Sequence, residues 1–360
     1  MLKRVAVLCS AVALTATMAS VSVANASDPG ANSYRVTRLV SDEPGVAMHT
    51  DPNLVNAWGL AAGPTSPWWV ADNEKDVSTL YDADGNAIPL VVDVAGAPTG
   101  TVFNGTPAFI VKHAGFHGPA VFAFATESGT IRGWNPNVPP PAFSTQSFVL
   151  KDRSSAGAIY KGLATAVSTA GPLLYATDFH NGRVDVFDAH MDRVLVNAFH
   201  DPNIPAGFSP FGIQTLGNNV FVTYAKRDPA TDDDVSGPGL GFVDRFGLKG
   251  QFLGRVASRH ALDAPWGLAW APDGFGAFGG DLLVGNFGDG RINAFEPMAN
   301  GSFERAGVLR RANGSVIRID GLWAIAFGND AAAGSSDTLY FTAGPDDEEH
   351  GLFGRIAANT

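Results

Sequence analysis

A short phrase recurs along this chain at a spacing of about fifty residues, and it constrains the fold more than any other feature. The phrase is AWGLAAG from Ala57, YKGLATAV from Tyr160 and PWGLAWAPDG from Pro265. In each copy it opens a series of four short apolar runs separated by turn residues, which is the pattern of a four-stranded antiparallel meander. One such unit cannot bury a core alone, so the copies must pack on one another.

Three weaker copies lie between or after these units, and they begin with FNGTPAFIV, SPFGIQTLG and LWAIAFG. The six anchor positions are Gly59, Gly105, Gly162, Gly212, Gly267 and Ala324. The pattern predicts an all-β, six-bladed β-propeller with four-stranded blades. The last unit has only three runs, and we expect YRVTRLV at 34–40 to add the fourth and close the ring. The alternatives are an open solenoid, or a seven-bladed ring if the Pro-rich segment 134–150 contains a blade.

The first 26 residues have the features of a secretory signal. Lys3 and Arg4 precede a long apolar stretch that ends in Ala-Asn-Ala, a small-x-small cleavage site. We therefore expect a signal peptide at 1–26, a short linker at 27–33 and a single propeller domain at 34–358. The predicted location is secreted, either extracellular or periplasmic, with no membrane insertion after cleavage. The alternative is an uncleaved membrane anchor.

Composition excludes several classes of function. The single cysteine is Cys9, inside the predicted signal, so the remaining chain has no thiol nucleophile and no disulfide. The formal net charge is −11, and scattered acidic charge disfavours binding to nucleic acid. The 42 glycines and 23 prolines favour many tight turns over long helices.

Two sets of equivalent positions are expected at the central channel. The first set precedes the anchors, and we predict that it binds a ligand at one mouth. Its members are Trp58, Asn104, Lys161, Phe211, Trp266 and Trp323. Aromatic rings there would stack on a planar or sugar-like ligand, and the alternative is that they pack between blades.

The second set ends the second strand of each blade. Its polar members are Asp72, Glu127, Asp178 and Asn286, while Tyr224 and Ala343 occupy the other two positions. Oxygen ligands of this kind suit Ca²⁺ or Mg²⁺, so these four residues are candidate metal ligands. The alternative is that each side chain caps the turn that follows its strand.

Lys161 is the only cation in the first set, and it is the candidate catalytic residue. The simplest interpretation is an ion pair with Asp178 in the same blade or with a neighbouring acid. The alternative is a buried lysine with a lowered pKa that faces an anion or a carbonyl group. Two acidic loops, within 228–239 and 344–351, are expected to be solvated, with peripheral Ca²⁺ binding as the alternative.

Several long strings resemble a known family. They include DPNLVNAWGLA, FATESGTIRGWNP, DPNIPAGFSPFGIQ and LLVGNFGDGRINAFEP, and the resemblance extends from about Tyr34 to Ile356. The family comprises secreted bacterial proteins catalogued as conserved hypothetical, and LYATDFHNGRVDVFD resembles an NHL-type repeat. The resemblance implies an exported propeller and brings no activity. Gluconolactonase and senescence-marker propellers are more distantly similar; they hold a divalent metal in the channel and hydrolyse lactones or esters.

These observations lead to two functional hypotheses. The preferred one is an exported NHL-like propeller that binds a small molecule, a glycan or a protein at one mouth of its channel. The alternative is a divalent-metal-dependent hydrolase, lactonase- or esterase-like, in which Lys161 stabilises an oxyanion. Propellers serve both classes, so the fold does not decide whether the protein is an enzyme.

Overall fold

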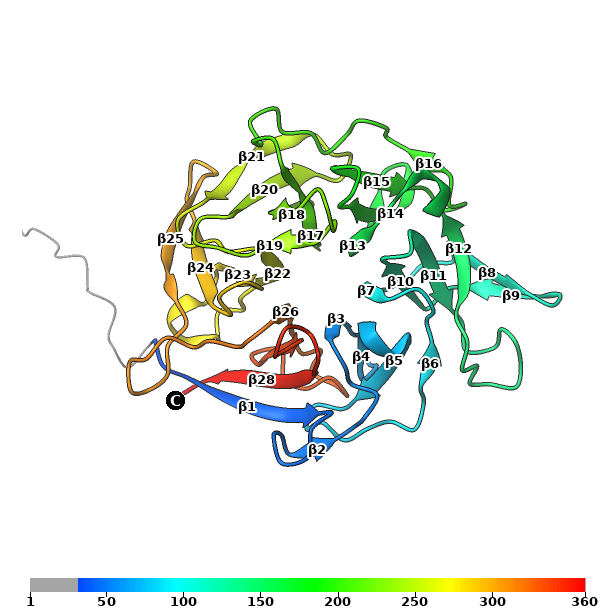
Figure 1. Cartoon of the computed structure of the whole chain (residues 1–360), viewed down its shortest axis with the longest axis horizontal. Coiled ribbons are helices and arrows are strands. Elements are labelled where there is room, and N and C mark those ends of the chain that lie inside the picture. Colours follow the sequence, from blue (N-terminus) through cyan, green and yellow to red (C-terminus); the bar gives the residue numbers. More distant parts are fainter. Residues whose placement is uncertain (1–31, 360) are drawn as a thin grey trace, which may run out of the picture.

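The computed structural model describes residues 32–359, which form six small antiparallel sheets arranged as a ring (Figure 1). This confirms the predicted six-bladed, all-β propeller. Blade 1 contains β3 (Ala57–Ala61), β4 (Trp68–Asp72), β5 (Val77–Tyr81) and β6 (Val92–Asp93). Blade 2 contains β7 (Pro98–Phe103), β10 (Phe122–Thr126), β11 (Thr130–Trp134) and β12 (Phe148–Asp152), with a hairpin of β8 (Ile110–His113) and β9 (Phe116–Pro119). Blade 3 contains β13 (Tyr160–Ser168), β14 (Gly171–Asp178), β15 (Arg183–Phe187) and β16 (Arg193–Val194).

The remaining three blades follow in chain order. Blade 4 contains β17 (Phe208–Leu216), β18 (Asn219–Arg227), β20 (Gly241–Gly247) and β21 (Phe252–Ser258), with β19 (Asp234–Val235) added to β18. Blade 5 contains β22 (Pro265–Trp270), β23 (Leu282–Asn286), β24 (Ile292–Pro297) and β25 (Phe303–Val308). Blade 6 contains β26 (Leu322–Phe327), β27 (Leu339–Ala343), β28 (Leu352–Ala358) and β1 (Tyr34–Ser41), with β2 (His49–Thr50) beside β1.

Helical structure in the described part of the chain is limited to three single 3₁₀ turns. These are η1 (Asn73–Lys75), η2 (Ser154–Ala156) and η3 (Gly276–Phe278). Within residues 32–359 no helix has both the length and the apolar character needed to cross a bilayer. The segment 135–147 between β11 and β12 is a loop with no named strand, so it contains no seventh blade.

The ring is closed by the N-terminal strand, as the sequence predicts. β1 pairs antiparallel with β28, and Val36 lies opposite Ile356. The Tyr34 hydroxyl also donates a hydrogen bond of 3.0 Å to the Phe275 carbonyl in blade 5. Blade 6 in turn contacts blade 1 through β26 and β3, which excludes an open solenoid.

Glycines allow the innermost strands to approach one another closely around the axis. A Cβ atom on Gly59 would lie 2.3 Å from the Thr99 carbonyl oxygen, and one on Gly212 would lie 2.1 Å from that of Trp266. Threonine hydroxyls join neighbouring blades at the same level. Thr177 Oγ1 donates to the Phe211 carbonyl at 2.6 Å. These contacts explain why the anchor positions tolerate so little side-chain volume.

The anchor of blade 2 is Gly100, and the assignment of Gly105 was wrong. The innermost strand of that blade is β7, and a Cβ on Gly100 would lie 2.4 Å from the Leu163 nitrogen of blade 3. Asn104 follows β7 and leads toward the β8–β9 hairpin, so it does not occupy a first-set position. Thr99 occupies that position instead. The error arose because PTGTVF has threonine on both sides of its glycine, where the clearest copies of the phrase have tryptophan and leucine.

Candidate functional site

One end of the central channel is filled by stacked aromatic side chains. Trp58 of blade 1 stacks on Trp323 of blade 6, with ring centroids 3.6 Å apart. Phe287 of blade 5 stacks on Trp323 at 4.0 Å. Phe211 of blade 4 meets Trp323 edge-on at 5.8 Å, although their blades are not neighbours. The rings therefore meet across the axis, and they fill the channel at this level.

This arrangement agrees with the alternative interpretation of the first set, in which the aromatic rings pack between blades, and does not agree with an open aromatic mouth. Trp58, Trp266 and Trp323 are at most 9% exposed, so they do not line an open mouth. They also pack on one another at the axis, in addition to contacting adjacent blades. The Trp323 indole donates to Asn56 Oδ1 at 2.9 Å. Among the described residues, the buried indole nitrogens of Trp58 and Trp266 have no hydrogen-bond partner.

Lys161 forms the expected ion pair, but its partner is the neighbouring acid Glu127 of blade 2 and not Asp178 of its own blade. Its ammonium also lies 4.9 Å from the centre of the Trp58 ring. Tyr160 is the residue opposite Asp178 in the sheet register. Since successive side chains of a strand point to opposite faces, Lys161 points away from Asp178.

The environment of Lys161 keeps it protonated. Burial alone would lower its pKa, but the negative charges of Glu127, Asp234 and Glu348 outweigh burial and raise the pKa above its usual value. A lysine nucleophile at neutral pH needs the opposite shift. These contacts favour a structural ion pair over a catalytic lysine.

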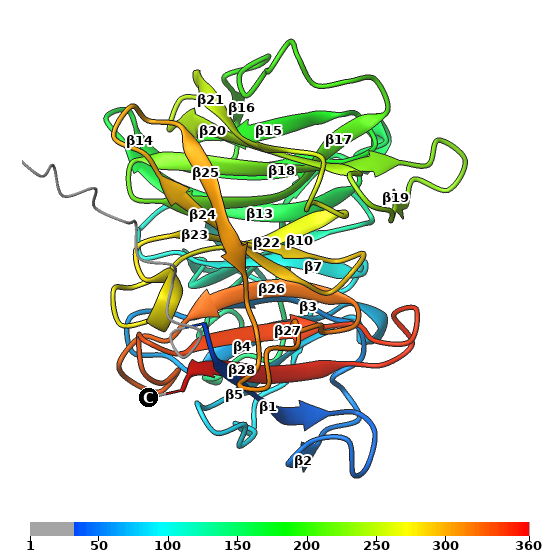
Figure 2. The same ribbon diagram turned by 90° about the vertical axis from the view of Figure 1, so that its left-hand side faces the viewer.

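Both acidic loops contribute to the surroundings of Lys161, although they were expected to be wholly solvated. Figure 2 shows the β18–β20 insertion and the β27–β28 loop extending from the same side of the ring. Glu348 accepts a hydrogen bond from Asn56 Nδ2. The Oδ2 atom of Asp234 is buried and, within residues 32–359, has no hydrogen-bond partner. We call Glu127, Lys161, Asp234 and Glu348 the axial charge cluster.

Two carboxyl groups of this cluster have raised pKa values. Burial raises the pKa of Asp234 to about 7; Lys161 opposes the shift, and Glu348 and Asp233 add to it. Burial likewise raises the pKa of Glu348. One ammonium thus faces three carboxyl groups, and the cluster favours protonation of at least one of them.

The four candidate metal ligands do not form one site. Asp72 accepts two hydrogen bonds from Thr79 in its own blade, at 2.8 and 2.9 Å. Asp178 pairs with Arg183 at 3.0 Å. Asn286 donates to Asp289 Oδ1 at 2.9 Å, and Glu127 is engaged by Lys161. Asp72, Asp178 and Asn286 therefore bond within their own blades, whereas Glu127 bonds to a lysine of the next blade. The hydrogen bonds of the four side chains thus go to protein groups and favour no shared Ca²⁺ or Mg²⁺ site.

Asn104 is similarly engaged in local structure. It is 6% exposed, and its Nδ2 atom donates to the Ala120 carbonyl at 2.8 Å. Its Oδ1 accepts a 2.7 Å hydrogen bond from the Thr106 hydroxyl. These bonds brace the approach to the β8–β9 hairpin. They leave the side chain away from the other first-set residues.

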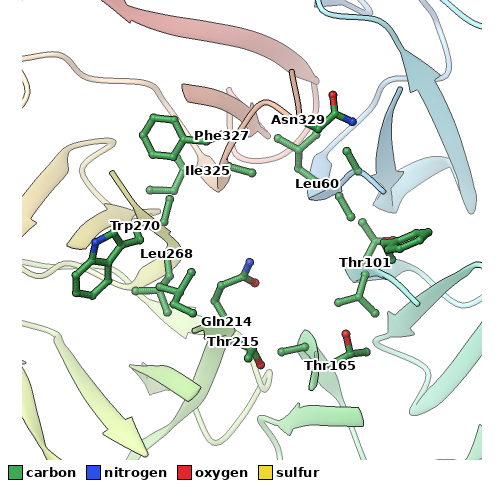
Figure 3. Close-up of a pocket in the computed structure, with 18 of the residues that line it drawn as sticks. Leu60, Thr101, Thr165, Gln214, Thr215, Leu268, Trp270, Ile325, Phe327 and Asn329 are labelled. Carbon is green, nitrogen blue, oxygen red and sulfur yellow. The ribbon is translucent and has the colours of Figure 1, made fainter. Parts of the chain in front are cut away.

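The opposite end of the channel holds a cavity of about 420 Å³. All six blades line it with residues that follow the anchors on the innermost strands (Figure 3). Leu60, Leu268 and Ile325 supply apolar surface. No lining residue carries a charge, which distinguishes this cavity from the axial charge cluster at the other end.

A few polar side chains are placed among the apolar residues that line the cavity. The Gln214 side chain extends into it, and Thr165 lies on the same side (Figure 3). In the described part of the chain neither side chain makes a hydrogen bond to protein, so both are available to a ligand. Asn329 lies at the edge, but it donates to the carbonyls of Gly63 and Ser66 at 2.7 and 2.9 Å. Trp270, 39% exposed, also lines the cavity.

The sequence interpretation missed these cavity residues because it looked at the wrong end of the innermost strands. It selected positions before each anchor, where the residues are conspicuous aromatics. The cavity is built from positions one or more residues after the anchor, such as Leu60 and Gln214. The repeated phrase could have indicated these residues, because an innermost strand lines the channel with residues both before and after its anchor.

Comparison with known proteins places the chain among propellers. It is 33% identical over 336 residues to "Uncharacterized protein R648" of Acanthamoeba polyphaga mimivirus, covering 90% of this chain and 80% of that protein. A protein of unknown function from Bacteroides thetaiotaomicron superposes with a TM-score of 0.56 at 10% identity, covering 90% of this chain and 76% of that one. A streptogramin B lyase gives a TM-score of 0.53 at 11% identity, with 92% and 99% covered. These two similarities show the fold alone. No protein-family model matches the chain.

Proposed function

The chain belongs to the same family as the uncharacterized protein R648 of Acanthamoeba polyphaga mimivirus. For this member of the family we propose that the open end of the central channel binds an uncharged small molecule. The observation that carries the proposal is the charge-free cavity of about 420 Å³ formed by all six blades. Concave, mostly apolar sites with a few polar groups are typical of small-molecule binding.

The chemistry of the lining defines the ligand class. Apolar walls from Leu60, Leu268 and Ile325 favour a compact apolar body. Gln214 supplies an amide donor and acceptor, and Thr165 supplies a hydroxyl. A charged ligand would lose its hydration without gaining an ionic partner, which disfavours it. A neutral cyclic compound with hydroxyl, amide or lactone oxygens on one edge fits these requirements.

The contrast between the two ends supports binding over hydrolysis. The end that carries ionisable groups is filled by Trp58 and Trp323, and its lysine is held in an ion pair. The open end has no acid, base or metal-ligating cluster among its lining residues. A hydrolase needs a nucleophile or an activated water beside its substrate. The cavity residues favour recognition without chemistry.

We also propose that the protein acts outside the cytoplasm. The proposal is supported by the sequence of residues 1–26, where a basic start, an apolar stretch and a small-x-small ending follow one another. That segment lies outside the described residues. Expression of the full chain, followed by N-terminal sequencing of the exported product, tests it. A product beginning at Ser27 is the expected result, and retention of the leader in the membrane contradicts it.

A thermal-shift screen tests the ligand class. Matched panels of neutral, anionic and cationic compounds are added to the protein, and we expect stabilising compounds to be concentrated in the neutral panel. Hits are then measured by calorimetry against Ala326→Phe, which fills the cavity with a ring. Gln214→Leu removes the central amide and keeps the volume. Both changes should weaken binding at least tenfold.

Gln251→Ala is the matched control, since Gln251 lies in blade 4, is exposed and is not part of the cavity. It should leave the affinity unchanged. Hits confined to charged compounds, or neutral hits that bind Ala326→Phe and Gln214→Leu as tightly as the original chain, contradict the proposal.

A further inference from the structure

A cluster of metal-ligating side chains lies at the seam where the ring closes, partly on the same β27–β28 loop that contributes Glu348 to the axial charge cluster. Glu43 belongs to the turn after β1, and Asp346 and His350 belong to the β27–β28 loop. One ligand atom from each residue lies within 4.8 Å of the others. We propose that this cluster binds a divalent first-row transition ion that links the turn after β1 to the β27–β28 loop.

The orientation of the imidazole is suited to metal binding. His350 Nδ1 lies 2.9 Å from Asp42 Oδ2, so that carboxylate accepts the Nδ1 proton, and in the neutral imidazole Nε2 keeps its lone pair for a metal. Metal-ligating histidines commonly have their other nitrogen held in this way. Asp42 Oδ1 also accepts a bond of 2.9 Å from the Gly351 backbone, which fixes the orienting carboxylate.

The spacing of the ligand atoms leaves room for an ion between them. His350 Nε2 and Glu43 Oε1 are 3.7 Å apart, which is too long for a hydrogen bond. Nitrogen and oxygen ligands bound tetrahedrally to one Zn²⁺ are separated by roughly 3.3–3.5 Å, so the two atoms would need to approach only slightly to share an ion. Asp346, an exposed residue, completes a set of one nitrogen and two carboxylates, and water can occupy a fourth position.

The local charge is unbalanced in favour of a cation. Asp42, Glu43 and Asp346 surround one imidazole, and Asp320 adds a fourth carboxylate by accepting from the Asp346 backbone at 3.0 Å. Arg38, Arg311 and Arg318 line the same cavity as Glu43 and Asp346. Within residues 32–359, however, no lysine or arginine forms an ion pair with Glu43 or Asp346. A bound divalent ion would supply positive charge in direct contact with these two carboxylates.

The mixed donor set selects the class of ion. Imidazole nitrogen favours Zn²⁺ and its first-row neighbours, whereas Ca²⁺ and Mg²⁺ prefer oxygen-only ligands. Zn²⁺ is therefore the probe of choice. The competing explanation is that His350 is simply a protonated partner of Asp42 and Glu43, with no metal involved.

Calorimetry on chelator-treated protein distinguishes the two explanations. Zn²⁺ alone should bind with a stoichiometry near one and raise the Tm, and Ca²⁺ alone at the same concentration should do neither. His350→Gln and Asp346→Asn should each weaken Zn²⁺ binding at least tenfold. Asp346 is exposed, so Asp346→Asn should fold normally and keep the measurement interpretable.

Two control variants guard against binding elsewhere. Asp347→Asn alters an exposed neighbouring carboxylate outside the cluster, and His117→Gln alters an exposed histidine of β9. Neither should change the affinity for Zn²⁺. The proposal is overturned if Zn²⁺ does not bind, if His350→Gln and Asp346→Asn retain full affinity, or if Ca²⁺ binds as tightly as Zn²⁺.

Discussion

The ammonium of Lys161 in blade 3 lies 4.9 Å from the centre of the Trp58 ring in blade 1, across the axis of the propeller. The two residues occupy equivalent positions in their blades, just before an anchor glycine. Lys161 takes part in the packing of aromatic side chains at this end of the channel by placing a cation over the face of the Trp58 ring. It also neutralises Glu127, which reaches the axis from blade 2. The lysine copy of the repeated phrase is therefore explained by packing and charge.

Lys161→Met should destabilise the protein by about 2–4 kcal/mol, because the buried carboxyl groups would lose their partner. Chemical denaturation of the variant measures the loss. Lys112→Met, at an exposed position in β8, is the control and should have little effect. Adding Glu127→Gln to Lys161→Met should recover part of the lost stability. Additive effects of the two changes would contradict the pairing.

Asp234→Asn should stabilise the protein more at pH 8 than at pH 5. The folded-state pKa of Asp234 is raised to about 7 by burial, with Lys161 opposing and Glu348 and Asp233 reinforcing the shift. The folded state then binds more protons than the unfolded state between about pH 4 and 7, so this group's contribution falls as pH rises through that window. We expect a gain of about 1–2 kcal/mol at pH 8.

Thermal unfolding of the Asp234 variant between pH 4 and 9 provides the measurement. Asp273→Asn is the control, since Asp273 is an exposed aspartate outside the axial charge cluster. The gain from Asp234→Asn should be nearly absent at pH 4. A gain of equal size at every pH would show that Asp234 does not titrate in the expected window.

Gly100→Ala should destabilise the protein by at least about 3 kcal/mol, since the added methyl group meets neighbouring backbone that cannot move. Its Cβ would lie 2.4 Å from the Leu163 nitrogen. Gly105→Ala is the control, because its Cβ would meet only the edge of the Phe103 ring at 3.1 Å. We expect a loss within about 1 kcal/mol there. Urea denaturation compares the two, and the reverse order would restore Gly105 as the anchor.

A chain beginning at residue 42 should unfold at a much lower temperature than one beginning at residue 32. The shorter chain lacks β1, which leaves the edge of β28 unpaired and open to association. Calorimetry and size-exclusion chromatography check both consequences. If the two chains have equal Tm values and both remain monomeric, β1 does not contribute to closing the ring.

The repeated phrase was sufficient to predict the blade number, the closing strand and most anchors, because spacing and strand pattern are local properties. It misplaced blade 2, where β7 carries a degenerate phrase and a hairpin follows it. It also could not reveal that Lys161 pairs with Glu127. That contact joins two blades, and Asp234 and Glu348 approach Lys161 from loops of two further blades. Contacts between residues so far apart in the sequence form only when the ring is closed.

The pairing of β1 with β28 has a consequence for how the protein is made. Val36 and Ile356 must find each other across nearly the whole chain, so closure is the most non-local step of folding. During translation the first five blades can emerge and begin to form, but β1 lacks its antiparallel partner until β28 (Leu352–Ala358) has been made. The N-terminal strand must therefore wait without that partner while the intervening five blades are synthesised.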